Sequence, residues 1–290
     1  MNRRQLLQAG LQACSPALVG AAWAQETTTP PKVLRFGTTP VFLDDQVGFL
    51  ARWATYLSTT VGTRVEFVSR RSYRDIMALL RTGDLEAAWI CGFPWVVNKA
   101  HLRGLSIPMY KSLPLYQSYL IVPASDTHTA SLVDLRGKVF AYSDPDSNSG
   151  YLVPRTTLMK AGKDPDAHFG RSFYTWGHRN VVSAVASGLA QGGAVDGYVW
   201  DTLQTVAPAL AANTRVAWRS ELYGFPPIAV RASLDTDTER RLRGALFGMS
   251  DDAVGKRLLA ELNLSSFGKF QPEVFDSIAR LAALAGVRAA

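Results

Sequence analysis

The sequence predicts an α/β fold in which largely parallel sheets are flanked by helices. Short apolar stretches with strand character alternate with amphipathic stretches of helical period along most of the chain. That alternation is typical of parallel strands joined by helical crossovers. The chain has 290 residues, 47% of them hydrophobic and 19% charged, which suits a folded protein with two domains of ordinary size or one large domain.

The first half of the chain supplies several predicted strands and helices after a polar linker over 25–31. Strands are expected over residues 33–36, 64–68, 85–90, 105–109 and 116–123. Helices are expected where apolar residues recur at three- and four-residue spacing, over 46–57, 73–81 and 95–102.

The second half continues this alternation and ends in helices. A short helix over 131–137 leads into a strand over 138–142, a hydroxyl-rich loop and a helix over 151–161. Further strands are expected over 172–176, 194–199, 215–219 and 227–231, and a helix opens at His178. Helices are expected at the end of the chain, over 236–247, 252–262 and 272–284.

Residues 1–24 are typical of an export signal peptide. Arg3 and Arg4 precede an apolar stretch that ends in a small-x-small cleavage pattern at Ala24. The arginine pair also favours the twin-arginine route, which exports folded proteins. The alternative is a lipoprotein with Cys14 as the lipidated residue, although the residues just before that cysteine fit this poorly.

Charge and motif content exclude several classes of protein. The formal net charge of +7 is spread along the chain, and its densest cluster, formed by Arg70, Arg71 and Arg74, is too short to predict a nucleic-acid partner. The sign of the charge suits an anionic small molecule. No nucleophile elbow, zinc-protease motif, glycine-rich nucleotide loop or cysteine-rich metal spacing occurs. The sequence therefore predicts neither an enzyme nor a bound cofactor or metal.

The hydroxyl-rich stretch Ser147-Asn148-Ser149-Gly150 is the strongest candidate site. It joins a strand to a helix, where hydroxyl and amide oxygens cap some free N–H groups and the others point outward. A helix start of this kind carries partial positive charge and suits a tetrahedral oxyanion. An ordinary capped helix without a ligand explains the same pattern, and on shape alone it is the commoner case.

Four further candidates follow strands or open helices: Thr39, Tyr73, Cys91 and His178. In open parallel sheets ligands bind at the edge where such junctions lie. Tyr73 and Tyr116 could donate phenolic hydrogen bonds, or simply pack in the interior. Cys91 could instead be a small buried hydrophobic residue, which burial statistics alone favour. His178 could be a switchable donor or an exposed histidine at a helix start. The remaining histidines lie in polar turns and are expected to be solvated: His101, His128 and His168.

Residues Asp144 to Pro154 resemble the signature of the phosphate-, phosphite- and phosphonate-binding periplasmic proteins of ABC transporters. Tyr73 in its helix, the strand over 116–122, and His178 followed by the segment 184–188 support the resemblance in the right order. The resemblance covers essentially the whole chain after the signal peptide. It implies a type II periplasmic-binding fold, in which two α/β lobes close on a ligand. Lobe I would comprise 32–122 and 226–290, and lobe II 123–225.

The resemblance also implies which residues bind the anion. Carried across, it places six of them in the pocket: Tyr73, Tyr116, Ser147, Asn148, Ser149 and His178. Thr39 at the end of the first strand is added as a seventh candidate. Tyr198 and Pro226 stand where relatives that bind aminophosphonates carry carboxylates, so Tyr198 is expected beside a ligand without an amine.

The resemblance therefore implies a periplasmic binding protein for a small oxyanion, namely phosphate, phosphite or a simple phosphonate. The protein is expected to be a monomer that closes about a hinge and delivers its ligand to an ABC transporter permease. The alternative concerns Cys91, which stands where typical members carry glycine. Related proteins that sense arsenic oxyanions use a pocket thiol, so this chain could be a periplasmic sensor of arsenite or a related oxyanion that signals to a histidine kinase.

Overall fold

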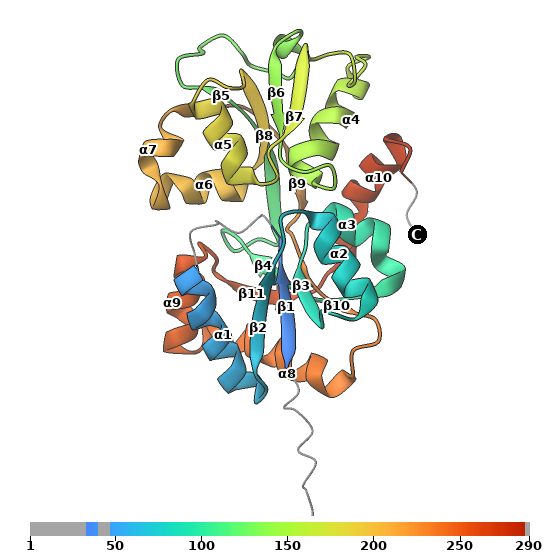
Figure 1. The fold of residues 1–290 in the computed structure, drawn as a ribbon, viewed down its shortest axis with the longest axis vertical. Coiled ribbons are helices and arrows are strands. Elements are labelled where there is room, and N and C mark those ends of the chain that lie inside the picture. The colour runs from blue at the N-terminus through green and yellow to red at the C-terminus, as the bar shows by residue number, and fades with distance from the viewer. Residues whose placement is uncertain (1–32, 40–46, 288–290) are drawn as a thin grey trace, which may run out of the picture. The chain divides into compact units, whose positions relative to one another are not determined.

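The computed structural model describes residues 33–39 and 47–287, which form two β-sheets flanked by helices (Figure 1). The α/β architecture expected from the sequence is thus confirmed. The predicted export signal over 1–24 and the linker over 25–31 lie outside the described residues. None of the helices in the described part of the chain combines the length and apolar character needed to cross a membrane.

The first sheet has six strands in the order β11-β4-β10-β3-β1-β2. β1 pairs in parallel with β2 and β3, whereas β10 and β11 are antiparallel to their neighbours. The bounds of the strands are β1 Leu34–Thr38, β2 Val65–Ser69, β3 Ala87–Trp89, β4 Leu102–Met109, β10 Ile228–Arg231 and β11 Ser266–Lys269.

Five helices flank this sheet: α1 Val47–Val61, α2 Tyr73–Thr82, α3 Gly92–Asn98, α8 Thr236–Phe247 and α9 Ala253–Glu261. α1 and α9 lie to one side and α2 and α3 to the other (Figure 1). The fully buried Trp53 of α1 packs against Phe36 and Phe67, with ring centroids 6.0 and 4.9 Å away. Burial of such large aromatic side chains stabilises the contact between helix and sheet.

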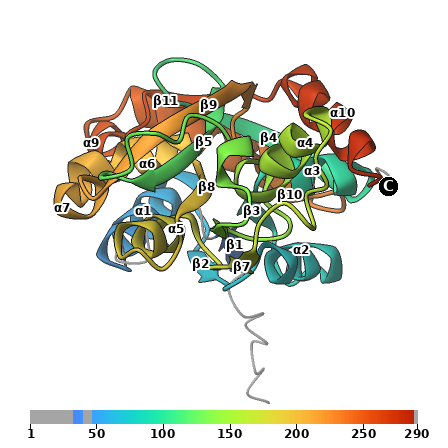
Figure 2. The same ribbon diagram turned by 90° about the horizontal axis from the view of Figure 1, so that it is seen from above.

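The second sheet has five strands in the order β7-β6-β8-β5-β9. β6 is parallel to β7 and β8, while β5 is antiparallel to β8 and β9. Figure 2 shows α4 on one side of this sheet and α5, α6 and α7 on the other. The bounds are β5 Leu115–Pro123, β6 Val139–Tyr142, β7 Arg171–Tyr174, β8 Gly192–Asp196, β9 Thr214–Gly224, α4 Val153–Lys160, α5 His178–Ala186, α6 Gly197–Val206 and α7 Pro208–Ala211.

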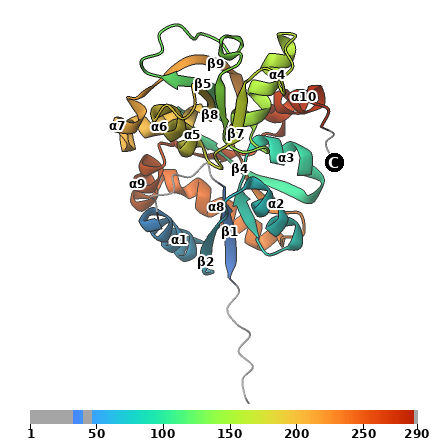
Figure 3. The ribbon, with the colours of Figure 1, turned by 45° about the horizontal axis from the view of Figure 1, so that its top comes forward.

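The chain passes between the sheets from β4 to β5 and returns from β9 to β10. β5 makes its hydrogen bonds in the second sheet, whereas the lobe boundaries expected from the sequence place residues up to 122 in lobe I. α10 (Asp276–Leu284) packs against α3 beside the first sheet and against α4 and β9 of the second (Figure 3). The division into two lobes stays a proposal in which the crossing strands belong to the sheet that they pair with.

The structure also differs from the predicted elements in three respects. Parallel pairs are confined to one end of each sheet, β3-β1-β2 in the first and β7-β6-β8 in the second, and the other pairs are antiparallel. The strand β11 was not predicted. His168, expected to be solvated, is buried, and its ring Nε2 hydrogen-bonds to the Leu132 carbonyl oxygen at 3.1 Å.

Candidate functional site

The candidate residues gather where the parallel strands of both sheets end. Thr39 follows β1 and Cys91 lies just beyond β3, while the hydroxyl-rich turn follows β6 and α6 begins directly after β8. Because the carboxyl ends of parallel strands share one edge of a sheet, each sheet presents its candidates at one edge. Contacts between side chains then join the two sets.

The hydroxyl-rich turn is a tightly packed helix start. Ser147 caps it, because its Oγ accepts a hydrogen bond from the Gly150 N–H at 3.0 Å. Residues Asn148–Leu152 form a short helical turn with π geometry that continues into α4. A Cβ at position 150 would lie only 1.9 Å from Ser143 Oγ, so the turn requires glycine here. Ser147, Asn148 and Ser149 are all fully buried.

A hydrogen-bond chain joins Tyr73, His178 and Asp196. The backbone N–H of Asp196 donates to His178 Nδ1 at 3.0 Å, and His178 Nε2 lies 3.1 Å from the Tyr73 hydroxyl oxygen. Because a backbone N–H only donates, Nδ1 is the acceptor and a neutral imidazole carries its proton on Nε2. His178 therefore donates to Tyr73. The Tyr73 hydroxyl proton is left without an acceptor among the described residues. Tyr73 can therefore donate it to a ligand, while the hydrogen bond from His178 orients the hydroxyl group.

A second set of contacts joins Asn148, Tyr116 and Cys91. The Asn148 side-chain nitrogen donates to the Tyr116 hydroxyl oxygen at 3.0 Å, which leaves the Tyr116 proton free to donate. The backbone N–H of Asn148 donates to Cys91 Sγ at 3.2 Å. Cys91 thus lies against the turn itself, as a buried thiol of the first sheet.

Two polar atoms of the turn have no hydrogen-bond partner in the part of the chain that the structure describes: Asn148 Oδ1 and Ser149 Oγ. Burial raises the pKa of the Tyr116 phenol, and the nearby Ser149 hydroxyl offsets a small part of that rise without forming a hydrogen bond of normal geometry. The Ser149 carbonyl is satisfied by the Ser118 hydroxyl, at 2.7 Å. Leaving a buried polar group unpaired costs about 1–3 kcal/mol, which a polar ligand would recover.

The donors of the site are electrically neutral. Burial lowers the pKa of His178 to about 3, so the imidazole is uncharged at neutral pH. Burial likewise raises the pKa values of the Tyr73 and Tyr116 phenols well above the usual value and that of the Cys91 thiol to about 12. All three therefore keep their protons.

Two buried carboxyl groups lie behind the donors. Asp144 accepts from the Tyr73 N–H at 3.1 Å, and Asp196 caps α6 by accepting from the Tyr198 N–H at 2.8 Å. Burial raises the pKa of both, to about 8 for Asp196. The sequence reasoning missed these two residues. It extended the strand of Asp196 to residue 199, whereas an Asp before Gly197 is a helix-capping signal that could have revealed the end of the strand.

The remaining two predicted ligand residues have their hydroxyl groups engaged in the fold. The Thr39 hydroxyl donates to the Trp89 carbonyl oxygen at 3.1 Å. The Tyr198 hydroxyl donates to the Leu262 carbonyl oxygen at 2.5 Å, and the ring packs on Phe225. Neither hydroxyl is a free donor, so any contact with a ligand would involve the Thr39 backbone or the Tyr198 ring.

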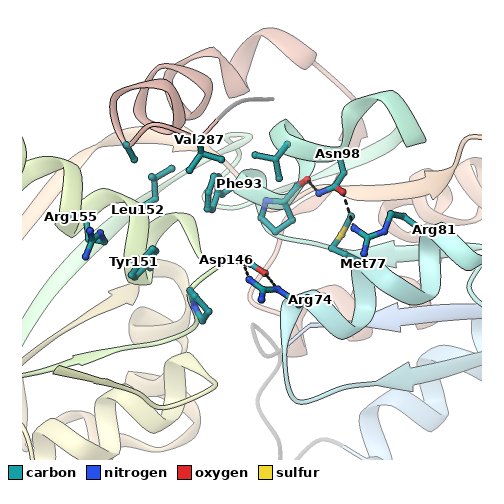
Figure 4. Close-up of a pocket in the computed structure, with 14 residues that line it drawn as sticks. Arg74, Met77, Arg81, Phe93, Asn98, Asp146, Tyr151, Leu152, Arg155 and Val287 are labelled. Atoms are coloured by element: carbon teal, nitrogen blue, oxygen red, sulfur yellow. Dashed lines mark hydrogen bonds and ion pairs between the residues drawn. The ribbon is translucent and has the colours of Figure 1, made fainter. Parts of the chain in front are cut away.

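No group of three or more histidine, cysteine or acidic residues in the described segments could hold a metal ion. A separate pocket of about 450 Å³ lies outside the hydroxyl-rich turn, between α2, α3 and α4 (Figure 4). Its wall includes Phe93 and Leu152 and three arginines: Arg74, Arg81 and Arg155. Each arginine is paired, with Asp146 at 3.3 Å, Asn98 at 3.2 Å and Asp166 at 2.6 Å respectively.

Comparison with known proteins places these features in a wider context. A family model described as "ABC transporter, phosphonate, periplasmic substrate-binding protein" matches residues 36–275. The chain is 27% identical over 199 residues to "Phosphate-import protein PhnD" of Mycolicibacterium smegmatis, a match that covers 64% of this chain and 62% of the relative, less than two thirds of its length. It is 25% identical over 260 residues to the "Phosphonates-binding periplasmic protein" of Escherichia coli, covering 86% and 75% of the two chains.

A solved structure shares the fold. The structure of PhnD1 from Prochlorococcus marinus in complex with methylphosphonate matches this chain with a TM-score of 0.79 at 20% sequence identity. The match covers 88% of this chain and 99% of that protein. At this identity the likeness concerns the fold, and the two-sheet arrangement described above is the feature that the proteins have in common.

Proposed function

The chain belongs to the family of periplasmic substrate-binding proteins of phosphonate ABC transporters, and from this premise we propose that it binds a small phosphorus oxyanion for delivery to such a transporter. The ligand would be phosphate, phosphite or a simple phosphonate. The names of the relatives point to the same compounds: phosphate import in one, phosphonates in another and bound methylphosphonate in the solved structure. A family of binding proteins implies no catalytic step.

The observation that carries this proposal is the set of unused donors around the hydroxyl-rich turn. The protons of Tyr73 and Tyr116 and the hydroxyl of Ser149 have no acceptor in the described segments. Phosphoryl oxygens are strong acceptors with several lone pairs, and neutral hydroxyl and N–H donors can bind them without a full counter-charge. Since these groups are buried, an anion between them would be shielded from water.

Binding would proceed by closure of the two lobes around the ligand. The contacts described above join residues of both sheets: Tyr73 with His178, the Tyr73 N–H with Asp144, and the Asn148 N–H with Cys91. Separating the lobes would break these contacts and admit water to the donors. The described arrangement would then be the closed form, and an open form would receive the ligand.

Localisation and partners follow from the family. Periplasmic binding proteins act outside the inner membrane, and the signal-like residues 1–24 would direct export, with Arg3 and Arg4 favouring the twin-arginine route. The partner would be the permease of an ABC transporter, and this protein would bind to it as a monomer. Burial raises the pKa of Tyr198, so this phenol is neutral and offers no counter-charge to an ammonium group, which favours ligands without an amine.

The second candidate function is sensing of arsenite or a related oxyanion for a histidine kinase. The observation that favours it is the position of Cys91, whose Sγ lies 3.2 Å from the Asn148 N–H in the middle of the cluster. Burial raises the pKa of this thiol to about 12, which opposes formation of the thiolate that binds arsenic. Transport of a phosphorus oxyanion therefore remains the first proposal.

Isothermal titration calorimetry of the purified protein tests both functions. Phosphate, phosphite, methylphosphonate and arsenite are titrated into the wild type, Ser149→Ala and Cys91→Ser. We expect a phosphorus oxyanion to bind, Ser149→Ala to weaken that binding by about 1–3 kcal/mol, and Cys91→Ser to retain it. Binding of arsenite alone, lost in Cys91→Ser, would establish the sensor instead. Binding of none of the four compounds would refute both functions.

A further inference from the structure

The amide of Asn148 presents an acceptor that the fold leaves unused. Its nitrogen donates to Tyr116, and its oxygen Oδ1 is fully buried without a donor among the described residues. A hydroxyl such as Ser149 can reverse its hydrogen bond, but an amide oxygen only accepts. A ligand that fills this site with acceptors alone would leave Oδ1 unsatisfied, at a cost of about 1–3 kcal/mol.

The free hydrogens of the site are provided by hydroxyl groups. Tyr73, Tyr116 and Ser149 can each donate to an oxygen of the ligand, while Asn148 Oδ1 requires a hydrogen from it. A fully ionised oxyanion brings no hydrogen. A neutral trihydroxy compound brings three hydroxyl hydrogens, but among these four side chains only Asn148 Oδ1 must accept one. A tetrahedral oxyanion with a single O–H group satisfies all four side chains.

The electrostatics favour the same form of the ligand. In the described part of the chain no lysine or arginine hydrogen-bonds to the three hydroxyl groups, and the imidazole of His178 that bonds to Tyr73 is neutral. The titratable groups of the cluster that interact electrostatically are Tyr73, Cys91, Tyr116, Asp144 and Asp196, and His178 hydrogen-bonds to Tyr73. A dianion would bring a second negative charge into a buried site whose donors, among the described residues, are all neutral, and burial of an uncompensated charge is costly.

We propose that the site selects a ligand that carries one P–OH group, which donates to Asn148 Oδ1; for phosphite and for a simple phosphonate this form is the monoanion. This inference deepens the function proposed above and rests on it. Asn148 is then the residue that distinguishes the protonated ligand from the fully ionised one. Sulfonates, which have the same shape but carry no proton at neutral pH, are excluded by that residue rather than by size.

The pH dependence of binding tests the proposal. Phosphite and methylphosphonate are titrated into the full protein between about pH 5.5 and about pH 9, a range that spans their second ionisations. Above each ligand's own second pKa, the apparent Kd should rise about tenfold per pH unit, because the competent fraction falls by that factor. The midpoint should therefore differ between the two ligands by the difference in their second pKa values, measured on the ligands alone.

Two outcomes would overturn the inference and leave the proposed function intact. A Kd that does not change with pH would mean that the Asn148 amide is turned, with its nitrogen donating to a fully ionised ligand. A midpoint that is the same for both ligands would assign the titration to a protein group. Absence of binding by either ligand at every pH would refute the proposed function and the inference together.

Proton uptake separates the ligand's proton from that of Asp196. Calorimetry in two buffers of different ionisation enthalpy, above the ligand's second pKa, should show uptake of about one proton per bound ligand. The matched variant Asp196→Asn keeps a helix-capping side chain and should take up the same proton. Loss of the uptake in this variant would place the proton on Asp196 and overturn the proposal.

A ligand analogue and a variant of Asn148 complete the test. Methanesulfonate should bind about 100-fold or more weakly than methylphosphonate near neutral pH, because it brings no hydrogen for Oδ1. Asn148→Thr replaces the obligate acceptor by a hydroxyl that donates or accepts, so its Kd should depend less steeply on pH. Equal binding of methanesulfonate and methylphosphonate by the wild type would overturn the proposal, and so would an unchanged slope in Asn148→Thr.

Discussion

The buried cluster around Asn148 and the arginine-lined pocket of Figure 4 are two contrasting settings for an anion. The pocket carries three guanidinium groups, yet each of them already has a partner within the protein. In the described part of the chain no lysine or arginine bonds to the hydroxyl groups of the cluster, but the cluster holds buried donors and an acceptor that the described residues leave unpaired. The two regions therefore differ in kind: unpaired buried polar atoms distinguish the cluster, and paired positive charge distinguishes the pocket.

The difference follows from the cost of desolvation. An exposed ion pair is weakened by water and salt and contributes little, so a pocket of paired arginines gains little by exchanging one partner for another. A buried polar atom without a partner is costly, and binding removes that cost in full. The three predictions below test this contrast, from the largest expected effect to the smallest.

The largest expected effect is the change with pH in the free energy of unfolding that the ionisation of Asp196 causes. Burial raises its pKa to about 8, from 3.8 in an unfolded chain, so between these pH values the folded state holds a proton that the unfolded state releases. Its contribution to the free energy of unfolding is thus constant below about pH 4 and falls as the pH rises towards 8, by roughly 6 kcal/mol for the whole shift. Asp196→Asn, which keeps the cap, should be the more stable protein at pH 8.

Urea denaturation of wild type and Asp196→Asn over this pH range measures the effect. His178 acts in the opposite sense, since burial lowers its pKa to about 3 and its contribution grows as the pH rises to its unfolded value of 6.5. That contribution is common to both proteins and cancels in their difference. A difference that stays constant from pH 4 to pH 8 would show that the carboxyl group is not held protonated by burial.

An intermediate effect is expected from comparing one change in each region. Tyr73→Phe keeps the ring but removes a buried donor, and should weaken phosphonate binding by about 1–3 kcal/mol, or roughly 5- to 150-fold in Kd. Arg81→Ala, in the pocket, should change Kd less than about threefold, because its side chain is exposed and already bonds to Asn98. Calorimetry with methylphosphonate measures both. A larger loss in Arg81→Ala than in Tyr73→Phe would move the candidate site to the pocket.

The sequence could predict the parts of this site that depend on neighbouring residues. The hydroxyl-rich turn and the helix starts at Tyr73 and His178 were found because capping and periodicity are local properties. The partners of Thr39 and Tyr198 could not be found in this way, since the carbonyl groups of Trp89 and Leu262 reach them only through the tertiary fold. The contact of Cys91 with the Asn148 N–H is also a tertiary contact, between residues 57 positions apart.

The smallest effect is expected from Arg74, which joins the two regions. Its guanidinium pairs with Asp146 at 3.3 Å and links α2 to the loop after β6, although 73% of the arginine side chain is exposed. A contact that exists only in the closed form favours closure by its own free energy, which for an exposed ion pair is about 0.2–1 kcal/mol. Arg74→Ala should therefore weaken ligand binding no more than about fivefold.

Salt distinguishes this contribution from that of the buried donors. The loss in Arg74→Ala should disappear at high ionic strength, where the exposed pair is screened, whereas the loss in Tyr73→Phe should persist. Asp146→Asn is the matched partner variant, and the double variant should lose no more than either single one, because both remove the same ion pair. A loss that survives high salt, or that doubles in the double variant, would show that Arg74 acts on the ligand directly and that the pocket shares in binding.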